Sequence, residues 1–140
     1  PGPDGLPDKP HRWRPGDDAY HLLGVEVRAP GLVDGLPAGW AWFRLKLPVV
    51  AGEDPTPLQR ICAAADFANG ISYRIDPRQT TFINPELTVY VQRLPVGGWV
   101  LLDARTWLEP HGTGMTEGGL YDQKGRIGRS LQALLLESRG

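Results

Sequence analysis

Hydrophobic residues repeat along this chain with two different periods, and the two periods separate one helix from several strands. Between residues 55 and 70, apolar and small residues recur at the three- and four-residue spacing of a helical face. Thr56 and Gln59 have the spacing of a capping box, and Pro57 suits the first helical position. The Asn-Gly pair at 69–70 supplies a stop signal. The pattern therefore predicts a single helix over 55–70.

The other patterned stretches alternate between apolar and polar residues, which is typical of half-buried strands. These stretches are Tyr20–Arg28, Trp40–Val50, Glu86–Leu94, Trp99–Glu109, Thr113–Tyr121 and Arg126–Glu137. Short glycine-containing connections join the last four, which predicts a meander of four consecutive antiparallel strands. The order strand, strand, helix and long meander predicts an α+β hotdog fold, in which a curved antiparallel sheet wraps around one central helix.

Two polar residues are expected beside apolar neighbours. On a helical projection, Asp66 lies next to Cys62 at the shoulder of the apolar face, so we expect the carboxylate to be partly buried. Alternation in the last strand places Gln132 on the same face as four apolar or small residues: Gly128, Ser130, Leu134 and Leu136. Both polar groups need partners, for structure or for chemistry, and an isolated helical Asp is more often structural. The single cysteine, Cys62, excludes an internal disulfide and is expected to be a small core residue.

Composition limits the classes of function. The chain has 140 residues and a formal net charge of −1, which suits one domain and provides no broad basic field for nucleic acid. No apolar run approaches the ~20 residues that span a bilayer, so a cytoplasmic location is the simplest expectation. The three histidines are dispersed and predict no metal site. Residues 1–18 are rich in Pro and Gly and are expected to form a linker or tail before a domain over 19–140.

Asp66 stands in the sequence ADF, and Gln132 ends the sequence GRSLQ. With these motifs, residues 20–137 resemble the acyl-CoA thioesterase II (TesB-like) family, in particular the second hotdog of its double-hotdog chains. The sequence ADF around Asp66 matches the helix aspartate of the family, and GRSLQ ending at Gln132 matches the glutamine of its last strand. A third position of the family is usually Thr or Ser. Counting back from Gln92 and Arg93 places Asn84 there, with Thr81 or Thr88 as the substitute if the count slips.

The resemblance implies an acyl-CoA thioesterase of lipid metabolism that hydrolyses fatty acyl-CoA by direct attack of a water. Asp66, Asn84 and Gln132 would hold that water, and no cofactor is needed beyond the coenzyme A that is part of the substrate. The resemblance also implies pairing with a second hotdog, either an N-terminal half or another copy in a dimer. Arg126 and Arg129 would contact the phosphates of coenzyme A or simply solvate an edge.

Two alternatives remain open on the same fold. A non-catalytic acyl-binding or assembly domain is favoured if Asn84, which is not a hydroxyl residue, marks a decayed site. A hydratase or dehydratase is expected to place a histidine on the helix that carries the acid. The stretch 55–70 contains no histidine, so this alternative ranks last.

Overall fold

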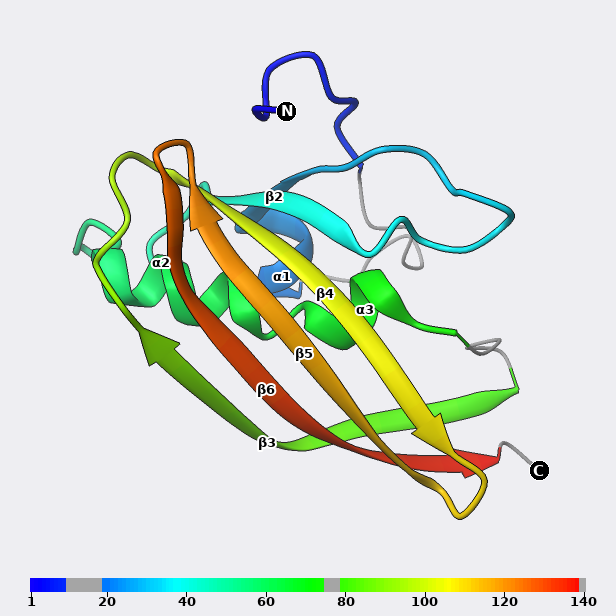
Figure 1. Cartoon of the computed structure of the whole chain (residues 1–140). Coiled ribbons are helices and arrows are strands. Elements are labelled where there is room, and N and C mark those ends of the chain that lie inside the picture. Colours follow the sequence, from blue (N-terminus) through cyan, green and yellow to red (C-terminus); the bar gives the residue numbers. More distant parts are fainter. Residues whose placement is uncertain (10–18, 75–78, 139–140) are drawn as a thin grey trace.

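A single antiparallel sheet curls around the helical segment of the chain (Figure 1). The structure is a computed structural model and describes residues 1–9, 19–74 and 79–138. The helices are α1 (Tyr20–Leu23), α2 (Pro57–Ala65) and α3 (Ala68–Ser72). The strands are β1 (Val25–Arg28), β2 (Trp40–Leu45), β3 (Thr80–Val91), β4 (Trp99–Glu109), β5 (Thr113–Asp122) and β6 (Gly125–Ser138). This arrangement confirms the predicted hotdog fold.

The strand order is β1-β2-β4-β5-β6-β3, which corrects the predicted four-strand meander. Strands β4, β5 and β6 do follow one another as hairpins, but β3 lies at the far edge and pairs with β6 along its length. The physical reason is the connection between β3 and β4. Because β3 ends at Val91 and not at Leu94, residues 92–98 form a link longer than a tight hairpin, and such a link can cross the sheet.

The two N-terminal strands are shorter than predicted. Tyr20–Arg28 begins with the helical turn α1, because Gly24 closes the turn with an N–H bond to the carbonyl of Tyr20 and only then does β1 begin. The Tyr20 hydroxyl donates to the carbonyl of Leu47 at 2.7 Å and holds this turn in place. Strand β2 ends at Leu45, short of the predicted Val50.

The predicted capping box is confirmed, but the predicted single helix is wrong. Thr56 Oγ1 accepts from the N–H of Gln59 at 3.2 Å, and Gln59 Oε1 accepts from the N–H of Thr56 at 2.8 Å. The helix then breaks at residues 66–67, and Asn-Gly at 69–70 lies inside α3 instead of ending a helix. Tertiary packing overrides the local signal here, since the Phe67 ring stacks on Phe43 of β2 with centroids 4.8 Å apart.

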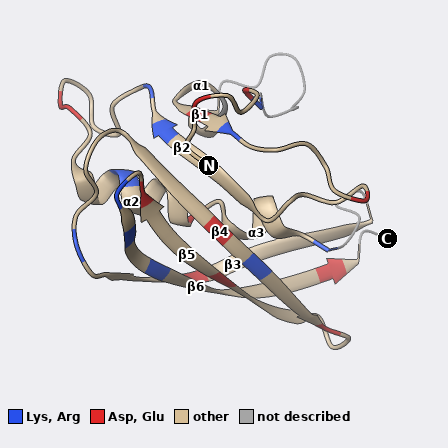
Figure 2. Ribbon diagram, turned by 45° about the horizontal axis from the view of Figure 1, so that its top comes forward, with Lys and Arg blue, Asp and Glu red and all other residues tan. Residues whose placement is uncertain are grey.

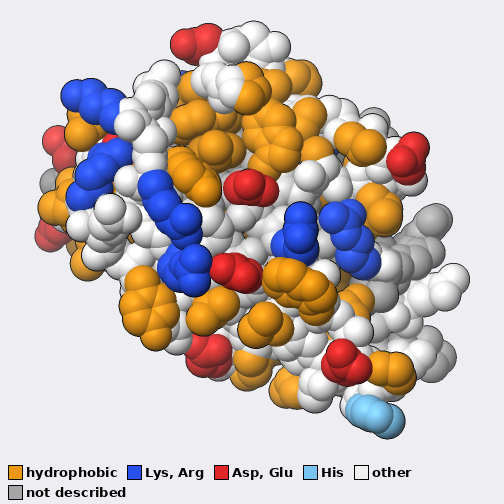
Figure 3. Space-filling model, viewed as in Figure 1, with side chains coloured by type: hydrophobic (Ala, Val, Ile, Leu, Met, Phe, Trp, Pro, Cys, Tyr) orange, Lys and Arg blue, Asp and Glu red, His pale blue; other side chains and the backbone are white. Residues whose placement is uncertain are grey.

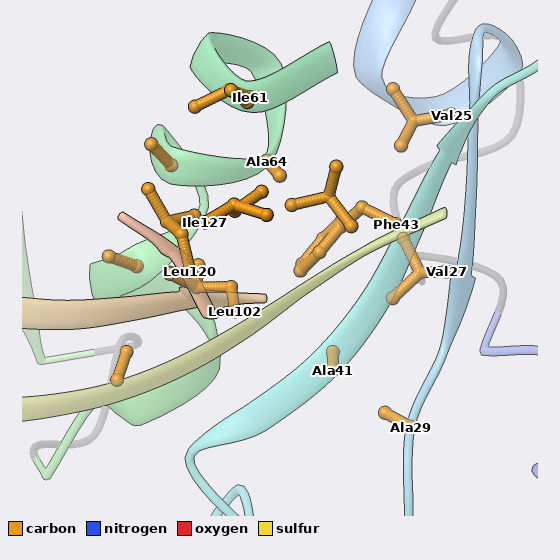
Figure 4. Packing of buried hydrophobic residues seen from close by; sticks show 14 residues of the cluster. Val25, Val27, Ala29, Ala41, Phe43, Ile61, Ala64, Leu102, Leu120 and Ile127 are labelled. Carbon is orange, nitrogen blue, oxygen red and sulfur yellow. The ribbon is translucent and has the colours of Figure 1, made fainter. Parts of the chain in front are cut away.

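The core lies between this broken helix and the inner face of the sheet (Figure 4). Its members include Phe43, Leu102, Leu120 and Ile127 from four strands, and Ile61 with three alanines from the helices: Ala64, Ala65 and Ala68. The small alanine side chains let the helices lie close to the sheet. The inner face of β4 alternates as predicted, with buried residues at every second position.

The buried face of α2 is rotated from the predicted one, which corrects two expectations. Cys62 is exposed and is not a core residue, and Asp66 is exposed and not partly buried. Ile61 and the alanines occupy the buried side, so the row that carries Leu58, Cys62 and Asp66 lies beside this buried side and is exposed. This open row matters for the site, because it leaves the acid accessible.

Residues 1–9 pack against the first two strands. The N–H of Lys9 donates to the carbonyl of Val27 at 2.9 Å, and the indole N–H of Trp42 donates to the carbonyl of Pro1 at 3.1 Å. Residues 10–18, the rest of the predicted linker, lie outside the described residues, so the predicted boundary at residue 18 stays a prediction. None of the helices in the described ranges has the length and apolarity that a membrane span requires.

Candidate active site

The structure brings the three predicted site residues together from three separate elements. Asp66 caps the C-terminus of α2, Asn84 lies in β3, and Gln132 lies in the middle of β6. The Asn84 side chain donates through Nδ2 to Asp66 Oδ1 at 3.0 Å. The Gln132 side chain donates through Nε2 to the backbone carbonyl of Asp66 at 3.3 Å. The acid is therefore held through its carboxylate and through its backbone.

A β-bulge explains how Asn84 reaches the helix. The pairing of β3 with β6 shifts register between Ile83 and Glu86, so Asn84 and Pro85 together lie opposite the single residue Leu134 of β6. Pro85 has no N–H to give to the ladder, which favours an irregularity at this edge strand. Of the two substitutes considered from the sequence, Thr88 donates its hydroxyl to Glu86. Neither threonine is bonded to Asp66 among the described contacts, and Asn84 is.

The amide of Gln132 has one satisfied end and one open end. The side chain is buried, with 1% of the residue exposed, yet its Oε1 atom has no hydrogen-bond partner in the described part of the chain. The orientation of the amide is fixed, because the carbonyl of Asp66 can only accept and must therefore face the NH₂ group. A buried carbonyl oxygen without a donor is unfavourable, so this site lacks one hydrogen-bond donor.

A row of buried hydroxyls crosses the sheet next to Gln132, and no predicted site residue belongs to it. Thr106, Thr116 and Gln132 are direct cross-strand neighbours on β4, β5 and β6. Thr106 Oγ1 lies 2.9 Å from Thr116 Oγ1 and 2.6 Å from Ser72 Oγ of α3. The signal in the sequence was polar residues at inward positions of three adjacent strands. The signal could be found only once the strand register was known.

An ion pair between a buried carboxylate and a partly exposed guanidinium anchors the strand that carries Asn84. Arg93, just beyond β3, donates to both carboxylate oxygens of Asp122 at 2.6 and 2.7 Å. Two backbone N–H groups, from Val96 and Lys124, also donate to this carboxylate at 2.8 Å each. The hydrogen bonds from Arg93, and then those from the backbone, hold the pKa of Asp122 far below its usual range despite its burial.

An apolar cavity lies beside the polar cluster. Its walls are Asn69, Tyr73, Arg74, Phe82, Thr106, Leu108, Leu134 and Leu136. For each site residue, a residue two or three positions away in the sequence lines this cavity. These residues are Asn69 for Asp66, Phe82 for Asn84 and Leu134 for Gln132. The exposed carboxylate of Asp66 and the buried, unpaired carbonyl of Gln132 therefore belong to segments that also line this small cavity.

The matching family model is described as the acyl-CoA thioesterase C-terminal domain, and it matches residues 3–136. The chain belongs to this family. A search of curated proteins finds no match.

Solved structures resemble the domain in fold. An acyl-CoA thioesterase II, TesB2, from Mycobacterium marinum matches with a TM-score of 0.64 and 18% identity, over 100% of this chain and 55% of that one. A protein described as a candidate thioesterase from Novosphingobium aromaticivorans matches with a TM-score of 0.68 and 26% identity, over 98% of this chain and 52% of that one. A hotdog protein of unknown function from Alicyclobacillus acidocaldarius matches with a TM-score of 0.61 and 15% identity, over 100% and 54%. The domain spans about half the length of these structures.

The two arginines considered for coenzyme A lie on the outer face of the sheet. Arg129 pairs with Glu117 at 3.6 Å, and the Arg126 guanidinium lies 5.9 Å from the ring centroid of Tyr121. Figure 3 shows basic and acidic side chains side by side on this face, and Figure 2 shows both signs distributed along the ribbon. Since Gln132 faces the helices, the sheet of this domain separates both arginines from the polar cluster.

Proposed function

We propose that this domain is the water-activating half of a fatty acyl-CoA thioesterase. The single observation that carries the proposal is the meeting of Asp66, Asn84 and Gln132, with one buried carbonyl oxygen left open. Membership in the acyl-CoA thioesterase C-terminal domain family supports the choice of a thioester substrate. The cavity near the cluster has a volume of about 10 Å³ and holds about one water, so in this proposal a second hotdog completes the site for the acyl chain.

The hydrogen-bond inventory of the site supports direct attack by water. A water in this cluster would donate one hydrogen to the Asp66 carboxylate and the other to Oε1 of Gln132. Donation of both hydrogens leaves the oxygen lone pairs of the water free for the thioester carbon. Attack at that carbon forms the new C–O bond, Asp66 takes a proton, and the C–S bond then breaks to release coenzyme A and the free acid. The electron pair leaves on sulfur, and the thiolate takes up the proton that Asp66 received, which restores the carboxylate.

Asn84 has a supporting role in this proposal. Its Nδ2 hydrogen bond fixes one oxygen of the Asp66 carboxylate and leaves the second oxygen for the water. A hydroxyl, which the family usually has at this position, would donate a single hydrogen bond, and an amide nitrogen can do the same. The departure from Thr or Ser therefore preserves the donor.

The proposal includes a second hotdog, because this domain has an unpaired edge strand and exposed apolar side chains. Strand β3 is an edge strand of 12 residues. Large apolar side chains are exposed in two regions. One is α2 with the loop before it, and the other is β3 with the loop after it: Leu47, Val49, Val50, Leu58, Ile83, Tyr90, Val91, Leu94 and Val96. A second hotdog, from another copy or from an N-terminal half, would cover such surface and close the substrate site.

An assay of hydrolysis with a panel of acyl-CoAs tests the proposed activity. The assay measures the free thiol of the coenzyme A that is released. The domain is assayed alone, at concentrations that allow self-association, and joined to an N-terminal hotdog half. We expect Asp66→Asn to lower turnover by about 10²–10⁴-fold, and Gln132→Ala and Asn84→Ala by about 10–10³-fold. Circular dichroism should show unchanged folding for all three variants.

Two matched variants serve as controls. Asp103→Asn and Gln92→Ala change the same types of residue at exposed positions away from the cluster and should keep wild-type turnover. An Asp66→Asn or Gln132→Ala variant with wild-type turnover would remove that residue from the mechanism. Tight acyl-CoA binding without hydrolysis in either form would instead support the non-catalytic acyl-binding alternative.

A further inference from the structure

The buried hydroxyl row has a direction that can be worked out from its last acceptor. Ser72 Oγ lies 2.8 Å from the backbone carbonyl of Ala68, which can only accept, so the single hydroxyl hydrogen of Ser72 is used there. Thr106 must then donate to Ser72 across their 2.6 Å contact. Thr116 in turn must donate to Thr106 across 2.9 Å. The hydrogens therefore all point from β5 through β4 to α3.

This direction has a consequence for Gln132. Thr116 is the direct cross-strand neighbour of Gln132, and opposed side chains have Cβ atoms about 4.5–5.5 Å apart. The Thr116 hydroxyl is thus the nearest side-chain donor on the adjoining strand that could reach the open Oε1 atom by rotation. It does not do so, because its hydrogen is bonded to Thr106.

We propose that Thr106 is a positioning residue whose hydroxyl takes the hydrogen of Thr116 and thereby keeps the Gln132 carbonyl free for the attacking water. This inference rests on the proposed function, since it assigns a purpose to the open carbonyl. All four side chains are nine-tenths or more buried: Ser72, Thr106, Thr116 and Gln132. Bulk solvent therefore does not compete for their hydrogen bonds.

The proposal predicts an unusual order of effects for valine substitutions, which keep the shape of threonine and remove its hydroxyl. In Thr106→Val, the Thr116 hydroxyl loses its acceptor and turns to Gln132 Oε1, so kcat should fall about tenfold. In Thr116→Val, no hydroxyl opposite Gln132 remains on β5 to occupy Oε1, so kcat should stay within about twofold of wild type. The double variant should recover the activity that Thr106→Val loses, which is a strongly non-additive result.

The experiment measures kcat and KM for one acyl-CoA, in the form of the protein that hydrolyses it, with the folded fraction recorded at the assay temperature. Thr113→Val is the matched control and should not change kcat, because Thr113 is exposed on β5, the strand that carries Thr116. Thr106→Ser, which restores a hydroxyl, should recover most of the activity. A purely structural role predicts instead that kcat per folded molecule is the same in all variants.

A crystal structure of Thr106→Val provides a readout that does not need activity. We expect Thr116 Oγ1 within about 3 Å of Gln132 Oε1, the normal range for such a bond. A Thr116 hydroxyl that points elsewhere, or a double variant as slow as Thr106→Val, would overturn the inference. These results are distinguishable from failure of the proposed function, which would appear as wild-type turnover in Asp66→Asn or Gln132→Ala.

Discussion

At Gln132 the amide nitrogen is bonded and the amide oxygen is not, and this asymmetry organises the site. The sequence was sufficient to predict that Asp66, Asn84 and Gln132 belong together, because a family pattern links them. It did not predict that Asp66 is exposed. Helical periodicity leaves the rotation of a helix open when alanines occupy several faces, and here packing chose the face with Ile61.

Asp122 supports a prediction about pH at the scale of one residue. Its folded pKa is depressed, first by the hydrogen bonds from Arg93, whereas an unfolded Asp has a pKa of about 3.9. The stabilisation is therefore fully present above that value. It is lost as the pH falls toward the folded pKa, because the unfolded chain then binds the proton first.

We expect Asp122→Asn to lower the free energy of unfolding by about 1–2 kcal/mol at pH 7, since the buried carboxylate loses its charge-assisted hydrogen bonds while solvent screens the partly exposed Arg93. The difference from wild type should shrink between pH 5 and pH 3. Urea unfolding of both proteins at pH 7 and at pH 3 measures this difference in stability. Asp103→Asn, at an exposed position, is the control. An equal difference at pH 7 and pH 3 would contradict the role assigned to this ion pair.

Among the elements, β3 shows most clearly what sequence patterns leave undetermined. Alternation predicted most strand positions, with β4 correct at both ends, because one face of each strand is buried. Pairing depends on contacts between distant segments, so the location of β3 beside β6 was missed. The bulge at Asn84 was missed for the same reason, since only the register with β6 defines it.

Gly128 allows a test of this pairing. A Cβ atom at Gly128 would lie 2.2 Å from the carbonyl oxygen of Tyr90, so the backbones of β3 and β6 can approach only with glycine there. We expect Gly128→Ala to lower the free energy of unfolding by about 2 kcal/mol. It should also increase hydrogen exchange along β3.

Gly31→Ala is the matched control, because a Cβ there would meet no atom within 4 Å. The Gly31 variant should keep wild-type stability and wild-type exchange. Equal stability of both variants would contradict the close approach of β3 to β6 at Gly128.

The whole molecule is expected to associate, because β3 is an open edge and apolar residues of α2 and of loop 46–50 are exposed. Light scattering over a concentration series should show a dimer of the domain, or a stable complex with an N-terminal hotdog half. A monomer that persists at high concentration and does not bind such a half would contradict the pairing proposal.

The central claim is that a water, and not the carboxylate of Asp66, attacks the thioester. Single turnover in H₂¹⁸O with enzyme in excess tests it directly, because each molecule of acid then forms in a first cycle. Direct attack predicts that the released fatty acid carries one ¹⁸O and that Asp66 stays unlabelled by mass spectrometry. Unlabelled acid together with ¹⁸O in the Asp66 carboxylate would show a covalent anhydride and contradict the account.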